Sequence, residues 1–467
     1  MNKKKKLLLI NPVNQYRKGF TRSKITRYPP LAFGIISALT PDNWEVEIID
    51  ENFDEFKFKE ADLVGLTGFT ASIYRAYMIG KEYLEKDIPV VIGGIHVSML
   101  PEEAANYANS VVIGEVESCW AELINDFENG EMKKVYKGEK LSLDNIPQID
   151  FSIFHPDYYV GSTLTTRGCP FDCEFCTVTS FNGGKYRMRP VENVLDEIEK
   201  IPQERFFFID DNIIGYSKAS KRHAAAIFQG MIDRGIKKQW WSQASLNFAE
   251  DEDLLKLAYD SGCRLIFLGI EAETVEGLQV TNKTLNAKVG PDKYSTAFDK
   301  IKAAGISVLG SFIFGLDTDS EQDLINRKDF ILNSSADCYQ TGILTPLPGT
   351  RTYKRMEEEG RIIRTNYPED WQYYSVIDVT FKPNNMSPEK LKEVMDNNWL
   401  ELYDKKTITR KFIKTLRGTK DIQSSTWAVS TNMSYRNIMH ELFGSKELFT
   451  IEDLIGPFEN AFGKEKK

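Results

Sequence analysis

Short apolar runs alternate with amphipathic segments along most of this chain. In the first 150 residues the apolar runs are rich in aliphatic and β-branched residues, and a turn or a helical pattern follows each one; they are "KKLLLINP", "VEIIDE", "LVGLTGF", "PVVIGGIHV" and "SVVIGEVE". This alternation predicts a doubly wound (Rossmann-like) parallel sheet of five strands. We expect it to form a separate α/β domain over residues 1–145.

A second series of apolar runs occupies residues 155–360. Its six members are "STLTTR", "RFFFIDD", "QWWSQAS", "RLIFLGIE", "VLGSFIFG" and "QTGILTPL". The segments between them carry apolar residues three and four positions apart and often end at glycine, as helices do. The pattern predicts six parallel strands with crossover helices, and functional residues are then expected where the strands end.

Residues 361–467 are predicted to form a C-terminal extension that is mostly helical. Trp371, Tyr373, Tyr374 and Phe381 precede a helix that Ser387 is expected to cap. These aromatic residues either line a pocket for a large apolar molecule or pack the helix onto the preceding domain. The last fifty residues are predicted to be amphipathic helices with a charged end, to which we assign no role.

The composition narrows the class of protein. A chain of 467 residues with 42% hydrophobic residues and a net charge of -9 is globular, with two or three cores. The acidic balance opposes a nucleic-acid carrier, since phosphate binding needs a basic surface. No apolar run reaches the ~18 residues of a membrane span, and "MNKKKKLLLINPV" lacks the cleavage site of a secretory signal. We therefore expect a cytoplasmic protein.

Three of the six cysteines, Cys169, Cys173 and Cys176, lie together in "TTRGCPFDCEFCTVTS". Zinc is disfavoured because no second close pair follows, and a redox dithiol is disfavoured because Asp172 and Glu174 oppose thiolate formation. A four-iron four-sulfur cluster needs four ligands. Three cysteines would hold three corners of a 4Fe-4S cluster and leave one iron open to a small molecule.

The spacing of these cysteines, with the aromatic Phe175 directly before the third, resembles the signature of the radical S-adenosylmethionine (SAM) enzymes. The resemblance implies a partial (β/α)6 barrel in which SAM chelates the open iron and is cleaved to a 5'-deoxyadenosyl radical. It also implies a small-molecule substrate and a low-potential electron donor such as flavodoxin or ferredoxin.

Polar residues stand at the ends of the predicted barrel strands. The second strand ends in "FFFIDDN" and the fourth in "FLGIE". The resemblance implies that Asp210 and Asp211 hold the methionyl amino group of SAM. It implies further that Ser245 or Glu271 reaches the ribose and that Ile313 lies against the adenine. The alternative is that such residues cap the helices that follow them.

In the N-terminal domain, "YPPLAFGIISALT", "GLTGFTAS", "VVIGGIHVSMLPEEA" and "VVIGEVE" resemble the cobalamin-binding domain of one branch of these enzymes, which includes hopanoid methylases and the anaerobic magnesium-protoporphyrin ester cyclase. The glycines would let the sheet edge approach a flat corrin. No G-x-G-x-x-G follows the first strand, which disfavours a dinucleotide. The residues expected to contact cobalamin are Thr67, Gly68, Ser72, Gly93, Gly94, His96 and Glu115.

The D-x-H-x-x-G motif of classical cobalamin domains is absent, since the chain reads "DENFDEF" after the second strand. No histidine of that motif can then ligate cobalt. For His96 we favour a helix-capping or tail-contact role over a cobalt-ligand role. The alternative for the whole domain is a scaffold that has lost its cofactor.

The resemblance covers about the first 400 residues and predicts a cobalamin-dependent radical SAM enzyme. The expected reaction is methylation of an unactivated carbon of an apolar or natural-product-like substrate, with one SAM supplying the methyl group through cob(I)alamin and a second the radical. Radical oxidation, cyclisation or carbon-carbon coupling without methyl transfer is the first alternative. An iron-sulfur electron-transfer or sensing protein is the second.

Overall fold

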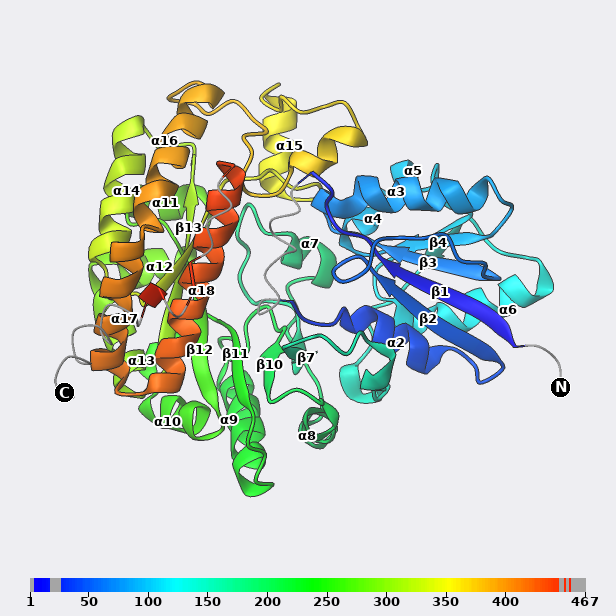
Figure 1. The fold of residues 1–467 in the computed structure, drawn as a ribbon, viewed down its shortest axis with the longest axis horizontal. Coiled ribbons are helices and arrows are strands. Elements are labelled where there is room, and N and C mark those ends of the chain that lie inside the picture. Colours follow the sequence, from blue (N-terminus) through cyan, green and yellow to red (C-terminus); the bar gives the residue numbers. More distant parts are fainter. Residues whose placement is uncertain (1–3, 17–26, 445–448, 451–452, 455–467) are drawn as a thin grey trace, which may run out of the picture.

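Two six-stranded parallel sheets form the framework of the chain (Figure 1). The computed structural model describes residues 4–16, 27–444, 449–450 and 453–454. The first sheet comes from the N-terminal part of the chain and the second from the middle, and the C-terminal helices pack on the second sheet. The predicted fold class is confirmed.

The first sheet has the strand order β2-β1-β3-β4-β5-β6. The strands are β1 (Lys5–Asn11), β2 (Trp44–Asp50), β3 (Leu63–Thr67), β4 (Val90–Gly93), β5 (Ser110–Ile113) and β6 (Val135–Lys137). The first five match the predicted runs, whereas the edge strand β6 was not predicted. The strand order reverses between β1 and β3, and ligands of such sheets bind beyond the carboxyl ends of the strands near that point.

Both faces of the first sheet are buried. Alternate residues of β1 belong to separate apolar clusters: Leu7 and Leu9 to one, Leu8 and Ile10 to the other, all without exposed surface. Helices α2 (Leu31–Leu39) and α6 (Trp120–Asn129) cover the first face. The second face is covered by α3 (Thr70–Leu84), α4 (Ile95–Met99) and α5 (Pro101–Ala104).

The second sheet has the order β14-β13-β12-β11-β10-β7, with every pair parallel. Its strands are β7 (Gly161–Thr163), β10 (Arg205–Phe208), β11 (Gln239–Ala244), β12 (Cys263–Glu271), β13 (Ser307–Phe314) and β14 (Cys338–Ile343). All six match the predicted runs. The sheet is not closed, because β7 and β14 do not pair.

Crossover helices cover one face of the second sheet (Figure 1). They are α8 (Val191–Lys200), α9 (Lys218–Asp233), α10 (Glu252–Asp260), α11 (Val275–Val280), α12 (Thr284–Val289), α13 (Tyr294–Ala303) and α14 (Glu321–Asn333). Phe206, Phe208 and Trp240 are buried on this face, and Trp240 stacks on Phe228 of α9. Phe207 and Trp241 alternate with them and therefore face the opposite side.

Helix α18 covers that opposite side. The C-terminal extension comprises α15 (Arg351–Glu358), α16 (Pro388–Leu402), α17 (Lys405–Thr419) and α18 (Ile422–Leu442), and α18 contacts β12, β13 and β14. The predicted cap of α16 is confirmed, since Oγ of Ser387 accepts a hydrogen bond from N of Lys390 at 3.1 Å. The charged end at 462–467 lies outside the described residues.

The aromatic residues of the extension pack rather than line a pocket. Trp371 and Tyr374 are buried in the second-face core of the first sheet, and the Trp371 ring stacks on Tyr367 at 3.8 Å. The Nε1 atom of Trp371 donates to Glu103 at 3.0 Å. Of the two alternatives, packing therefore applies, and the extension packs against the first sheet as well as the second.

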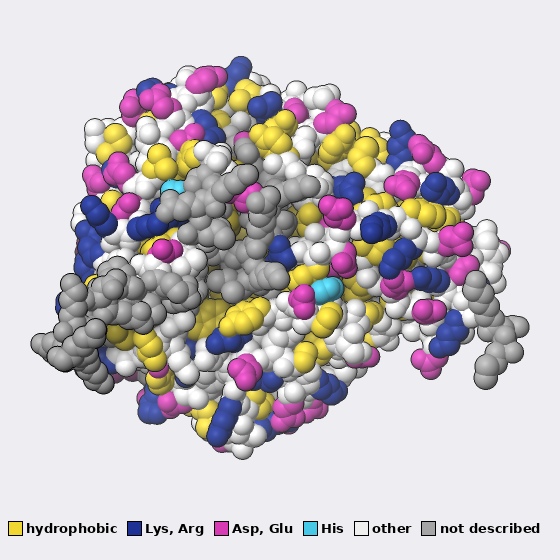
Figure 2. All heavy atoms as spheres, viewed as in Figure 1, with side chains coloured by type: hydrophobic (Ala, Val, Ile, Leu, Met, Phe, Trp, Pro, Cys, Tyr) yellow, Lys and Arg dark blue, Asp and Glu magenta, His cyan; other side chains and the backbone are white. Residues whose placement is uncertain are grey.

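Charged side chains of both signs are interspersed over the face shown in Figure 2. Within the described part of the chain, no helix combines the length and apolar character needed to cross a bilayer.

Candidate active site at the facing strand ends

The three clustered cysteines occupy the loop between the short strand β8 (Thr166–Arg167) and α7 (Thr177–Asn182). Gly168 starts the loop with φ +94°, and a Cβ atom there would lie 2.6 Å from the carbonyl oxygen of Lys185. Only glycine suits that turn. The thiols of Cys169, Cys173 and Cys176 are partly buried.

The electrostatics of this loop favour a bound cation. Burial and the neighbouring Cys173 raise the pKa of Cys169 to about 11 and that of Cys176 to about 12, and burial also raises the pKa of Cys173. Thiolates so close together need a positive charge, which a metal cluster supplies. The expected acidic repulsion is reduced, because Arg351 pairs with Asp172 at 2.6 Å and with Glu174.

The three described cysteines are not placed to coordinate one metal ion together. Among the described residues, no group of three or more His, Cys, Asp or Glu side chains is placed to hold one metal ion. An iron-sulfur cluster does not require such convergence, because each thiolate binds a different iron. The three-cysteine loop thus suits a cluster better than a zinc ion.

Asp210 has a structural position rather than a ligand-facing one. Its buried carboxylate accepts hydrogen bonds from the backbone N and the hydroxyl of Thr165 and from the hydroxyl of Thr166. Burial nevertheless raises its pKa. These bonds fix the chain just before the cysteine loop to the end of β10, and they occupy the side chain that was expected to contact SAM.

Asp211 faces the cysteine loop. Burial and the adjacent Asp210 raise its pKa to about 6, opposed by hydrogen bonds from N of Gly168 and from Asn182, whose Nδ2 lies 3.1 Å from Oδ2. The carboxylate therefore lies beside the first residues of the loop and retains capacity to accept a ligand proton or cation.

Glu271 is held in a strained conformation at the end of β12. It has φ +67°, and the pairing with β13 shifts register between Gly269 and Glu271. Its Oε1 lies 2.8 Å from Nζ of Lys283, and a Cβ atom on Gly269 would lie within 2.6 Å of both groups. A left-handed non-glycine residue costs about 1–3 kcal/mol, and such strain is concentrated at functional sites.

Ser245 follows β11 and belongs to a polar chain. Its hydroxyl accepts from Nδ2 of Asn212 at 3.0 Å and donates to Oδ1 of Asn247. Its side chain caps no helix. The carboxylates are not helix caps either, since Ser217 caps α9 and Thr274 caps α11. The capping alternative is therefore wrong for Ser245, Asp211 and Glu271.

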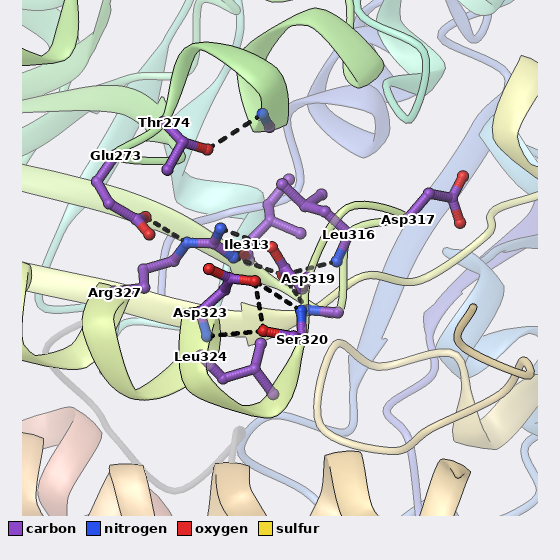
Figure 3. A network of polar contacts seen from close by, with 12 residues as sticks. Glu273, Thr274, Ile313, Leu316, Asp317, Asp319, Ser320, Asp323, Leu324 and Arg327 are labelled. Carbon is purple, nitrogen blue, oxygen red and sulfur yellow. Dashed lines mark hydrogen bonds and ion pairs between the residues drawn. The ribbon is translucent and has the colours of Figure 1, made fainter. Parts of the chain in front are cut away.

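Ile313 is partly buried near the end of β13, where a buried ion-pair network fixes the backbone (Figure 3). Arg327 donates to the carbonyl oxygen of Ile313 at 2.6 Å and pairs with Glu273 and Asp319. Asp319 in turn accepts from N of Leu316 at 2.9 Å. Phe175 is likewise partly buried against the main core. The network holds the segment expected to meet adenine.

A cavity of about 260 Å³ lies beyond the carboxyl ends of the first sheet. Thr67, Gly93, Gly94 and Glu115, all expected to contact cobalamin, line it. Arg167 and Asn182 line it from the side of the cysteine loop, so the cavity adjoins both parts of the chain. It contains several apolar side chains as well, among them Leu31, Phe33, Val112, Trp120 and Leu164.

Glu115 has a second, structural contact. Its buried carboxylate pairs with Arg187 and lies 3.0 Å from Nη1 of Arg167, which also pairs with Glu117. Burial opposes ionisation of Glu115, but the two guanidinium groups hold its pKa below the usual range. Glu115 thus clamps the first sheet to β8 and β9 (Arg187–Met188).

The remaining residues expected to contact cobalamin lie outside this lining. The hydroxyl of Ser72 donates to the carbonyl oxygen of Phe69, within the first turn of α3. His96 is buried, with Nδ1 3.2 Å from Oγ1 of Thr70 and Nε2 3.3 Å from Glu103. Gly68 packs against Ile73. Gly68, Ser72 and His96 are therefore not among the residues that line the cavity, although Gly68 directly follows β3.

Sequence reasoning missed Lys283, Arg351 and Arg167. Each contacts an acidic residue near the cysteine loop, and each comes from a segment with no motif of its own. The only signal for Arg167 is its position two residues before Cys169. Lys283 lies 12 residues beyond Glu271, a separation that becomes a contact only through the fold.

Comparison with known proteins agrees with this geometry. The model of the Radical SAM superfamily matches residues 163–331, which contain the three cysteines. The chain is 30% identical to bacteriochlorophyllide d C-12(1)-methyltransferase of Chlorobaculum tepidum over 87% of this chain and 89% of that protein. It is 28% identical to the hopanoid C-2 methylase of Rhodopseudomonas palustris, over 73% and 66% of the two chains.

Among solved structures, the methyltransferase TsrM of Kitasatospora setae, with cobalamin and a [4Fe-4S] cluster bound, superposes with a TM-score of 0.63 and 19% identity, covering 84% of this chain and 85% of that one. This likeness shows a shared fold. With the curated relative matched over almost its whole length, the resemblance inferred from the cysteine motif is confirmed: the chain belongs to the radical SAM superfamily.

Proposed function

We propose that this enzyme is a cobalamin-dependent radical SAM methyltransferase acting on an unactivated carbon. The observation that carries the proposal is the cavity of about 260 Å³ shared by the two sheets. Gly93 and Gly94 line one side of it, and Arg167 and Asn182 line the side of the cysteine loop. A ligand bound to the first sheet in this cavity would lie beside the proposed iron-sulfur site.

The donor groups around the cysteine loop fit a cluster and SAM. Three thiols suit an iron-sulfur cluster with one open iron. The amino-acid end of SAM carries one ammonium and one carboxylate group. The Glu271–Lys283 pair offers an acceptor for the first and a cation for the second, while Asp211 offers a further acceptor.

The first sheet fits part of a cobalamin. A Cβ atom on Gly93 would make only ordinary contact with Val112, at 3.5 Å, so packing within the protein does not require glycine there. A close ligand would explain it. The cavity is smaller than the about 300–1,000 Å³ of typical ligand pockets, which suits the base of a nucleotide tail and leaves the corrin outside.

When bound, the cluster would supply the electron that cleaves SAM, and cobalamin would carry the methyl group. The residues of the chain hold and shield these groups. Glu271 and Lys283 orient the methionyl end, and the apolar walls of the shared cavity limit access of water to a reactive site.

The relatives support the reaction class, because the two curated relatives described above carry methyltransferase or methylase names. We further propose a small-molecule substrate of apolar character and a low-potential donor such as flavodoxin or ferredoxin. All six cysteines are free thiols, as expected in the reducing cytoplasm, where we propose that the enzyme works.

The test is anaerobic turnover of the reconstituted enzyme with SAM, hydroxocobalamin and a strong reductant, followed by quantification of two products. Formation of both 5'-deoxyadenosine and S-adenosylhomocysteine is expected. Formation of 5'-deoxyadenosine alone would instead favour radical oxidation, cyclisation or coupling without methyl transfer. If neither product formed, the proposed chemistry would be wrong.

A further inference from the structure

A second cavity, of about 560 Å³, lies between the second sheet and α18. It is within the about 300–1,000 Å³ range of small-molecule pockets. Its sheet wall consists of the side chains that alternate with the outward-facing core residues, and its other wall is the polar face of α18, including Thr426 and Ser430. The proposed function needs a substrate site, and nothing described so far provides one.

The sheet wall offers an apolar surface. The rings of Phe207 and Trp241 stack at 3.8 Å with an interplanar angle of 11°, and Phe267, Leu265 and Leu309 continue the same wall. Rings stacked face to face on neighbouring strands turn their edges toward the cavity, where they can contact the face of an aromatic ligand.

Two glutamine side chains of the cavity offer free hydrogen-bond donors. Oε1 of Gln239 accepts from Nε1 of Trp427 at 2.7 Å, and because an indole nitrogen can only donate, the amide orientation is fixed. Oε1 of Gln340 likewise accepts from the hydroxyl of Tyr435 at 2.8 Å. Neither amide nitrogen has a hydrogen-bond partner among the described residues, so both remain available to acceptors on a ligand.

Arg205 is the one charged residue among the described residues of the lining. Its guanidinium lies 4.9 Å from the ring centre of Tyr159, and within the described part of the chain it pairs with no carboxylate. By contrast, Arg187 and Arg327, two buried arginines of the candidate active site, are both paired with acidic groups. An unpaired guanidinium, with two free amide donors in the same cavity, suits a single carboxylate.

The cavity extends from Arg205 toward the active site. Arg205 starts β10, whereas Gln243 lines the cavity near the end of β11, with its Nε2 3.4 Å from the carbonyl oxygen of Asp210. Arg205 precedes Asp211 by six residues, a span of about 20 Å in extended chain. A ligand that reaches both ends must be elongated.

We infer that this cavity binds the substrate of the proposed reaction, and that the substrate is an elongated, apolar molecule with one carboxylate, which Arg205 binds while the opposite end points toward the cysteine loop. The inference rests on the proposed function for the identity of the ligand as substrate. The chemical class rests on the cavity alone.

The experiment is anaerobic equilibrium dialysis of the full-length, cluster-reconstituted enzyme with anthracene-2-carboxylate and with the neutral anthracene-2-methanol. The carboxylate is expected to bind at least tenfold more tightly, because a hydrogen-bonded charge pair is worth that factor or more. Arg205→Gln should remove this difference and leave the alcohol unaffected. Trp241→Leu should weaken both ligands.

The matched control is Arg364→Gln. Arg364 also stacks on a tyrosine, with its guanidinium 4.4 Å from the Tyr373 ring, but it lies outside the cavity lining. The Arg364→Gln variant should leave the affinities for both anthracene compounds unchanged. Thermal unfolding of each variant separates loss of binding from loss of fold.

Equal affinities for acid and alcohol, or an unaffected Arg205→Gln variant, would overturn the carboxylate assignment. No binding of either compound to a folded enzyme would overturn the inferred class as a whole. Parallel assays of 5'-deoxyadenosine distinguish failure of this inference from failure of the proposed function. Formation of 5'-deoxyadenosine without probe binding refutes this inference only. Its absence refutes the proposed function, even if the probes bind.

Discussion

The Nζ atom of Lys283 lies 2.8 Å from Oε1 of Glu271, and the charge of Lys283 acts directly on the thiols of Cys173 and Cys176. Burial opposes the ammonium form, but Glu271 and the thiols raise the pKa of Lys283 above its ordinary value. Two opposite charges beside the cysteine loop, one on a strained residue, match the two charges of an amino acid.

Removing either charge should weaken SAM binding without loss of the cluster. Glu271→Gln and Lys283→Met are each expected to raise the dissociation constant of SAM by about 10- to 100-fold, since each removes a charged hydrogen bond of about 1.5–3 kcal/mol. Equilibrium dialysis with labelled SAM measures this. Lys288→Met is the control, because Lys288 is an exposed lysine on α12, the helix that follows Lys283. Unchanged affinity in both variants would make the pair purely structural.

The cluster should depend on three cysteines only. Replacement of Cys169, Cys173 or Cys176 by Ala is expected to abolish the visible iron-thiolate absorbance and the bound iron after reconstitution. The other three cysteines, Cys119, Cys263 and Cys338, are buried thiols, and their Ala variants should retain the cluster. A requirement for any of those three would contradict the open-iron interpretation.

Breaking the Glu115 clamp should destabilise the junction between the sheets. Glu115→Gln leaves Arg167 and Arg187 without their shared buried carboxylate, which is expected to cost about 3–5 kcal/mol. Denaturant unfolding gives the magnitude, and hydrogen exchange of β8 and β9 gives the location. Glu122→Gln, which breaks an exposed pair with Lys133, should cost less than about 1 kcal/mol. Equal costs would contradict the clamp.

Gly93→Ala is the sharpest probe of cobalamin binding. Gly94 has φ +104°, so any side chain there strains the fold whether or not a ligand binds. A methyl group on Gly93 meets only Val112 at 3.5 Å and should leave the unfolding temperature unchanged. We expect it to reduce the hydroxocobalamin retained through gel filtration. Gly184→Ala, where the methyl group meets nothing within 4 Å, should retain it fully; equal retention would argue against a corrin at this edge.

Lys411 should make stability depend on pH. Its Nζ is buried against the carbonyl oxygens of Ser334 and Ala336, both at 2.9 Å, and burial lowers its pKa to about 7 although Asp337 opposes the shift. Between pH 7 and the ordinary lysine pKa of about 10.4, the unfolded chain binds the proton and the folded chain does not. The contribution of Lys411 to the free energy of unfolding therefore rises with pH.

Lys411→Met should flatten this dependence. The slope of the unfolding free energy is expected to fall by up to about 1.4 kcal/mol per pH unit between pH 7 and 10. Urea unfolding at a series of pH values measures it. Lys414→Met, on the exposed side of α17, should keep the wild-type slope. A wild-type slope in Lys411→Met as well would mean that the folded chain keeps the ammonium form at all these pH values, which would contradict the prediction.

Much of the fold was predictable because strand periodicity is a local property. The six strands of the second sheet were predicted from their apolar runs, and Ser387 from its place before a helix. Strand β6 was missed because three residues with an exposed valine and lysine carry no period. Helix α18 was expected only as an amphipathic helix. It closes a cavity through Thr426 and Ser430, and this contact arises from tertiary packing that residue spacing does not predict.

The site was harder to predict at the level of single side chains. Asp210 and Asp211 are adjacent in the sequence, and only the backbone path past the end of β10 decides which one binds Thr165 and which faces the cysteine loop. Lys283 reaches Glu271 because β12 shifts register just before it. Neither feature has a signature in residue type or spacing.

The clamp on Arg167 limits how such proteins can be recombined. Arg167 belongs to β8 and stands two residues before Cys169. Its charge is nevertheless neutralised by Glu115 and Glu117, which follow β5 of the first sheet. A chimera that grafts a foreign N-terminal module onto this barrel must import both carboxylates in register. Otherwise it leaves a buried guanidinium next to Cys169, the first of the proposed cluster ligands, and we expect impaired iron loading while each half still folds.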